Sequence, residues 1–162
     1  MSKDTNKLAE VAFGILKGND SETNITINKG AVYKNGETEQ FTSIPNDYFH
    51  LALTLEKLEK QFHKKTPKYP DHYYSTPTFL DVGCGIGTTL RIAQELGYNA
   101  LGVEYNLALK EEHKKQGVMQ KIWYGDALNY LQYNEADIIY YYRPIGTQEK
   151  QKELENKIEN EI

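Results

Sequence analysis

The chain has 162 residues, 39% of them hydrophobic and 26% charged, which suits a single soluble domain with a buried core. Its net charge of −4 and its scattered lysines and arginines argue against a dedicated duplex-DNA-binding protein. The single cysteine, Cys84, excludes an internal disulfide framework and a cysteine-rich zinc site. The sequence has no apolar run of membrane-spanning length and no signal-peptide pattern, so we expect a cytoplasmic protein without a membrane partner.

The first 77 residues are predicted to form an extension of helix, hairpin, helix and linker, which would supply a lid and substrate contacts. Helical spacing of apolar residues predicts the two helices, and a hairpin-type turn joins the last two strands. The expected elements are a helix over 3–17, strands over 24–27, 31–33 and 38–42 around Lys34-Asn35-Gly36, a helix over 47–64 capped by Asn46, and a proline-containing loop over 66–77.

From residue 78 onward, apolar strands alternate with helices, a pattern typical of an α/β fold with a parallel sheet. Glycines end the first two helices at Gly97 and Gly117, and Thr147 can cap the last, whose apolar face is Leu154, Ile158 and Ile162. The predicted strands are 78–82, 100–104, 120–124 and 136–142, and the predicted helices are 88–96, 107–116, 127–132 and 148–161. We expect residues 1–77 and 78–162 to form one compact unit.

The segment FLDVGCGIG, residues 79–87, is the most informative of the chain. A buried strand runs into a glycine turn and then a helix, which lets a nucleotide approach backbone amides at the helix N-terminus. Asp81, at the end of the strand, would repel a pyrophosphate. It suits instead a ligand with an ammonium or sulfonium cation, such as S-adenosylmethionine.

Two further acids follow at the ends of the next two predicted strands. Glu104 ends the apolar run Leu101–Val103, and a carboxylate there can accept both ribose hydroxyls of an adenosine. Dinucleotide-binding enzymes share this feature, so by itself it does not discriminate between ligands. Asp126 follows in Gly125-Asp126-Ala127, where an Asp side chain can accept from an adenine amino group. Such an ordered series is hard to obtain by chance.

These segments resemble the class I (Rossmann-like) S-adenosylmethionine-dependent methyltransferases. FLDVGCGIG is similar to their first motif, LGVEYN to the ribose-binding segment, YGDAL to the adenine-binding segment, and ADIIYYYRP to the fourth, active-site motif. The resemblance covers about residues 78–145. The glycine spacing G-x-G-x-G, rather than the dinucleotide G-x-G-x-x-G, also favours the methyl donor.

The resemblance implies a set of site residues. Tyr140, Tyr142 and Arg143 would lie at the active-site strand end. The cofactor-binding residues would be Asp81, Gly83, Cys84, Gly85, Gly87, Thr88, Thr89, Glu104, Tyr105, Asp126 and Ala127.

Several of these residues have an ordinary structural interpretation, which stays open at this point. Thr88 and Thr89 are equally suited to capping the helix, and Asp126 to capping the short helix after it. The tyrosines of 140–142 are as well explained by strand packing. We interpret Cys84 as a small residue in the turn and not as a nucleophile.

The histidines show no spacing typical of metal ligands, so no metal site is expected. His113 lies on a helix that is predicted to be exposed.

The family's full sheet has seven strands, and we expect about four here, so the fold would be C-terminally truncated relative to the family. The outer edge of the fourth strand should then be covered by the N-terminal segment, another subunit of a homo-oligomer or a part of a longer parent.

These expectations favour a methyltransferase that acts on a small molecule, a protein or an RNA. Tyr142-Arg143-Pro144 departs from the motif of enzymes that methylate exocyclic base amines, and no cysteine follows the fourth strand for cytosine-C5 methylation. One alternative is a binding module or subunit without its own transfer activity. Another is an enzyme that uses the same cofactor for other chemistry, or an NAD-type oxidoreductase. The glycine spacing and Asp126 argue against the oxidoreductase.

Overall fold

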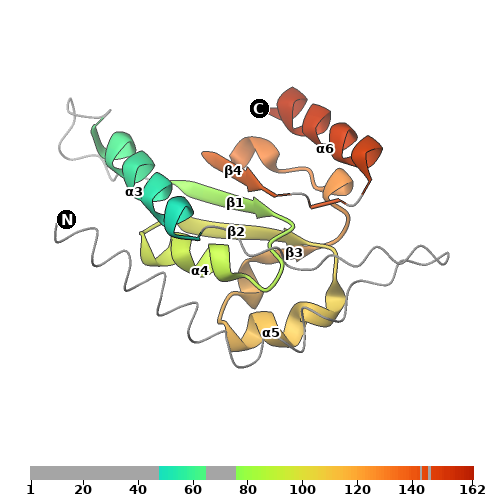
Figure 1. Cartoon of the computed structure of the whole chain (residues 1–162), viewed down its shortest axis with the longest axis horizontal. Coiled ribbons are helices and arrows are strands. Elements are labelled where there is room, and N and C mark those ends of the chain that lie inside the picture. Colours follow the sequence, from blue (N-terminus) through green and yellow to red (C-terminus); the bar gives the residue numbers. More distant parts are fainter. Residues whose placement is uncertain (1–47, 65–75, 143, 146) are drawn as a thin grey trace.

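The computed structural model describes residues 48–64, 76–142, 144–145 and 147–162. The predicted helix over 3–17, the hairpin and the cap Asn46 lie outside these residues, as does most of the proline-containing loop. The described chain has an α/β architecture in which helices cover a sheet (Figure 1).

The described strands form one all-parallel sheet in the order β3-β2-β1-β4. The chain moves outward from β1 to β3 and then returns to the other side of β1, so the strand order reverses beside β1. In Rossmann-like folds, ligands bind beyond the carboxyl ends of the strands at such a reversal. The strands are β1 (Thr78–Val82), β2 (Asn99–Glu104), β3 (Ile122–Tyr124) and β4 (Ile138–Tyr141).

Two hydrophobic layers hold the sheet because the side chains of β1 alternate between its faces. Phe79 packs with the layer of α3 and α4, which lie together in Figure 1, whereas Leu80 and Val82 pack with that of α6. The helices are α3 (Tyr48–Lys64), α4 (Thr88–Glu95), α5 (Lys110–Lys115) and α6 (Gln148–Glu161). Leu51 and Leu55 of α3 are buried, in agreement with the apolar spacing that predicted this helix.

The helix ends follow the predicted signals. Gly97 and Gly117 have φ angles of 89° and 72°, the left-handed conformation that glycine adopts after a helix. Thr147 caps α6 by accepting a hydrogen bond from the Lys150 N–H at 3.4 Å. The α/β class, the parallel sheet and these helix signals are therefore confirmed.

Several local predictions were wrong. β4 begins only at Ile138, and residues 107–109 form the 3-10 turn η1 (Leu107–Leu109) before α5. Residues 127–132 do not form a helix but the 3-10 turn η3 (Ala127–Asn129), and η4 (Tyr133–Glu135) follows. β3 begins only at Ile122, because η2 (Met119–Lys121) occupies the predicted start of that strand. Ile162 is 76% exposed, since the packed face of α6 ends at Ile158.

Candidate functional site

The glycine loop after β1 takes a backbone conformation that explains its composition. Gly83, Gly85 and Gly87 have φ angles of 79°, 55° and 87°, where other residues are strained. A Cβ on Gly83 would lie 2.6 Å from the Pro144 Cβ, and one on Gly87 would lie 2.8 Å from the Val118 Cγ2. A Cβ on Gly85 would meet nothing within 4 Å. The loop is therefore tightly packed at both ends and open at Gly85.

Backbone hydrogen bonds tie this loop to the end of β2. The N–H groups of Gly83 and Cys84 both donate to the Val103 carbonyl, at 2.8 and 3.1 Å. The Gly85 N–H donates to the Glu104 Oε2 at 2.9 Å. The fold itself thus uses the amides of Gly83, Cys84 and Gly85, so a ligand would have to use other groups of the loop.

Asp81 is a buried carboxyl group beneath the loop, only 3% exposed. Burial raises its pKa to about 7; the hydrogen bond donated by the Thr89 hydroxyl opposes this shift, and the nearby Glu104 adds to it. The predicted helix-capping role of the threonines is wrong, because Gly87 is the N-cap and no side chain caps α4. Thr89 instead holds Asp81 in place.

Glu104 lies beside Asp81 at the end of β2 and is 8% exposed. Its Oε1 accepts from the Asn106 N–H at 2.7 Å, while its Oε2 accepts from Gly85. Burial raises the pKa of Glu104, and these backbone hydrogen bonds oppose the shift. A carboxylate has about four acceptor positions, and the backbone of Tyr105 also hydrogen-bonds to this one, so about one further bond can be accepted. A ribose hydroxyl group would match that capacity.

Cys84 does not face outward from the loop. Its side chain is buried, and its Sγ packs against β2 where a Cβ on Gly102 would lie 2.9 Å from it. Burial raises the pKa of the thiol well above its usual value, and the charges of Asp81 and Glu104 add to this effect. A protonated, buried thiol is a poor nucleophile, which agrees with its interpretation as a small turn residue.

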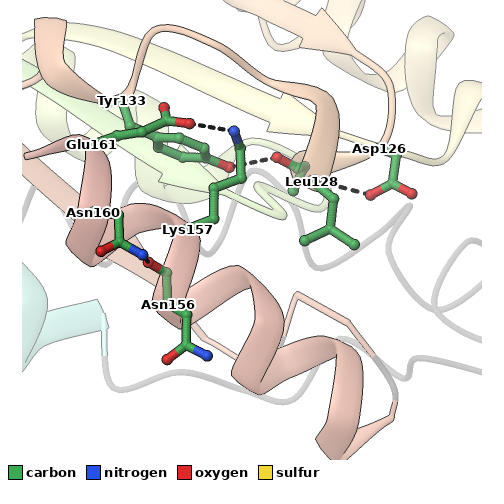
Figure 2. Close-up of polar contacts among 8 residues, drawn as sticks. Asp126, Leu128, Tyr133, Asn156, Lys157, Asn160 and Glu161 are labelled. Atoms are coloured by element: carbon green, nitrogen blue, oxygen red, sulfur yellow. Dashed lines mark hydrogen bonds and ion pairs between the residues drawn. The ribbon is translucent and has the colours of Figure 1, made fainter.

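Asp126 follows β3 and caps the turn after it, as the capping interpretation predicted. Its Oδ1 accepts from the Leu128 N–H at 3.0 Å. The other carboxylate oxygen points away from Leu128 (Figure 2). The Ala127 carbonyl accepts from the buried Tyr133 hydroxyl at 2.8 Å. Tyr133 thereby fixes the peptide between Ala127 and Leu128. Tyr105, beyond Glu104, is 53% exposed.

The predicted active-site tyrosines have different environments. Tyr140 stacks on Phe79 with ring centroids 6.2 Å apart and belongs to the core layer of α3 and α4. Tyr141 and Tyr142 are 37% and 49% exposed. Arg143 lies outside the described residues. Strand packing therefore accounts for Tyr140, whereas Tyr142 lies at the surface just past β4.

One buried polar residue was missed in the sequence. His113 was predicted to be exposed, but it is completely buried, and its ring nitrogens contact the Gly85 carbonyl at 2.5 Å and the Tyr124 hydroxyl at 2.7 Å. Leu109 is also buried, and its i, i+4 spacing to His113 places both on one helix face. That spacing was the signal that could have revealed the buried histidine.

No protein-family model matches this chain, and a search of curated proteins likewise returned no match. Among the residues that the structure describes, no cluster of three or more His, Cys, Asp or Glu side chains could hold a metal ion. The same part of the chain has no helix that is both long and apolar enough for a membrane span.

Proposed function

We propose that this chain binds S-adenosylmethionine and transfers its methyl group to an acceptor. The observation that carries the proposal is the pair of buried carboxyl groups, Asp81 and Glu104, next to a left-handed glycine loop. They lie at the carboxyl ends of β1 and β2, next to the reversal of the strand order. A cationic nucleoside suits that arrangement better than a pyrophosphate does.

The acceptor capacity of these residues fits the donor. Glu104 can accept a hydroxyl hydrogen besides its backbone bonds, as a ribose would offer. Asp126 has one carboxylate oxygen outside its capping bond, which can accept from an adenine amino group. Asp81 would face the positively charged end of the ligand. The open space at Gly85 lets a ligand approach the backbone closely.

The bound donor would supply an electrophilic methyl group on a sulfonium centre. Methyl transfer of this kind depends mainly on alignment and on removal of water. A strong nucleophile needs little acid–base assistance from the protein. The chain's own residues are suited to that task. Asp81 and Glu104 are already withdrawn from water and held by Thr89, Gly85 and Asn106, so they need little reorganisation when a cation binds.

Calorimetric titration with S-adenosylmethionine, S-adenosylhomocysteine and NADH tests this proposal. We expect the two adenosyl compounds to bind with dissociation constants on the order of 1–100 µM and NADH to bind far more weakly. Glu104→Ala should weaken adenosyl binding by at least about 10-fold, because a hydrogen bond to a charged group is lost. Glu111→Ala, at an exposed position of α5, is the matched control and should bind like the wild type.

Binding of NADH without either adenosyl compound would refute the proposal. Transfer itself is tested by incubating the protein with methyl-labelled donor and cell extract, and by separating small molecules, proteins and RNA. If the donor binds but no fraction gains label, the binding-module alternative replaces the enzyme.

A further inference from the structure

The buried histidine of α5 joins two segments that are far apart in the sequence. His113 Nε2 lies 2.5 Å from the Gly85 carbonyl in the loop after β1, and its Nδ1 lies 2.7 Å from the Tyr124 hydroxyl at the end of β3. Tyr124 immediately precedes Gly125-Asp126, the predicted adenine-binding segment. The imidazole thus bridges the glycine loop and the end of β3, which Asp126 follows.

The partners determine which nitrogen carries the proton. A carbonyl oxygen can only accept, so the Nε2–H must donate to Gly85. Burial lowers the pKa of His113, which favours the neutral ring. In a neutral ring the other nitrogen is an acceptor, so the Tyr124 hydroxyl donates to Nδ1. The result is one directed chain of hydrogen bonds from Tyr124 through His113 to Gly85.

This chain controls the orientation of the peptide between Gly85 and Ile86. A trans peptide points its carbonyl and its N–H in opposite directions, and the described residues contain no cis peptide bond. Because the Gly85 carbonyl faces the buried imidazole, the Ile86 N–H points away from it. The preceding N–H, that of Gly85, is held by Glu104. The N–H and the carbonyl of Gly85 are therefore both held by hydrogen bonds. Its φ of 55° is a conformation that glycine adopts without strain.

Neighbouring residues leave room for the contact between His113 and Gly85 and also pack against the Tyr124 ring. Gly87 lacks a Cβ that would lie 2.8 Å from Val118 and 3.6 Å from the His113 ring, so α5 can lie against the loop. The Lys110 ammonium lies 4.7 Å from the centre of the Tyr124 ring. In α5, His113 is the only buried residue, so the helix presents this one side chain to the loop.

We propose that His113 is a positioning residue that holds the glycine loop in its ligand-accepting conformation by donating to the Gly85 carbonyl. The role rests on the proposed function, because the ligand in question is the adenosyl compound. Tyr124 supports it by orienting the imidazole. A histidine that served only the stability of the fold would show a different response to substitution.

Titration with S-adenosylhomocysteine separates the two roles. His113→Leu should bind it about 10-fold more weakly, whereas His113→Gln, whose amide can still donate to Gly85, should stay within about 3-fold of the wild type. Tyr124→Phe keeps the ring beneath Lys110 and should weaken binding by about 3-fold. Leu154→Ala, in the opposite layer, is the destabilised control, and its folded form should bind like the wild type.

Nitrogen-15 spectra of the imidazole provide a readout independent of ligand. The wild type and Tyr124→Phe should both show the neutral Nε2–H tautomer. The inference is wrong if folded His113→Leu binds like the wild type, or if His113→Gln is as weak as His113→Leu. If His113→Leu does not fold, unchanged binding by Tyr124→Phe overturns it. If the wild type binds neither adenosyl compound, both the proposed function and this inference are wrong. If the wild type binds and the His113 and Tyr124 variants bind equally well, only the inference is wrong.

Discussion

Asp81 and Glu104 are two acids in a place where burial disfavours their charge. Both are less than 10% exposed, and neither forms an ion pair with another described residue. Such groups cost stability when they ionise, and this cost is offset only by their hydrogen bonds. Acids kept under these conditions are typical of binding sites, where a cationic ligand supplies the missing partner.

The raised pKa of Asp81 predicts a specific dependence of stability on pH. The folded protein keeps the proton up to about pH 7, while the unfolded chain loses it near 3.8, so the free energy of unfolding falls as the pH rises between these values. An asparagine at position 81 does not ionise, so Asp81→Asn avoids the free-energy cost of a buried carboxylate. Its stability relative to the wild type should rise on the order of 1–3 kcal/mol between pH 4.5 and 8, measured by urea denaturation.

The exposed Glu95→Gln is the control and should show no such change. A difference that shrinks as the pH rises would mean that Asp81 is favoured in its ionised form in the folded protein.

At the scale of elements, the glycine loop is defined by its neighbours. Pro144 past β4 restricts Gly83, and Val118 before β3 restricts Gly87, so of these three glycines only Gly85 combines a left-handed conformation with open space. Within one short turn, close packing and open space are thus found at different glycines.

Gly85→Ala tests whether that open space serves a ligand. The matched control is Gly97→Ala, since Gly97 also has a positive φ and nothing within 4 Å of a Cβ, but lies at the end of α4. Both variants should lose about 1–2 kcal/mol of stability from backbone strain. Only Gly85→Ala should weaken S-adenosylhomocysteine binding, as seen by calorimetry. Equal binding by the two variants would show that the space at Gly85 is not used.

At the scale of the whole molecule, α6 packs in the layer that reaches the candidate site. Leu154 is completely buried and packs in the layer of Leu80, Val82 and Tyr133. Through the Tyr133 hydroxyl, that layer reaches the Ala127 carbonyl, in the residue next to Asp126.

Leu154→Ala should therefore destabilise the whole described domain and not α6 alone. A loss of about 2–5 kcal/mol is expected for a buried leucine, against about 0.5 kcal/mol or less for Leu131→Ala at a 77% exposed position. Trp123 fluorescence and far-ultraviolet circular dichroism should report the same urea midpoint. Two separate transitions would show instead that α6 unfolds independently.

Much of this fold could be read from local patterns. Strand hydrophobicity, glycines after helices and the cap Thr147 act over a few residues, so the sequence alone predicted the parallel α/β class and the bounds of α6. The same local logic placed Asp81, Glu104 and Asp126 at strand ends. It failed over 127–132, where the Ala127 carbonyl accepts from the Tyr130 N–H in a 3-10 turn and also from the Tyr133 hydroxyl.

What the tertiary structure alone decided concerns contacts between distant segments. Which loop amides the fold uses, which glycine stays open and which acid becomes hard to ionise all depend on neighbours from other strands. His113 shows the difference most clearly: its helix was predicted, but its burial depends on packing against Gly85 and Tyr124, which lie 28 and 11 residues away in the chain. Local propensity sets the elements, whereas desolvation and hydrogen-bond partners arise only when the elements pack.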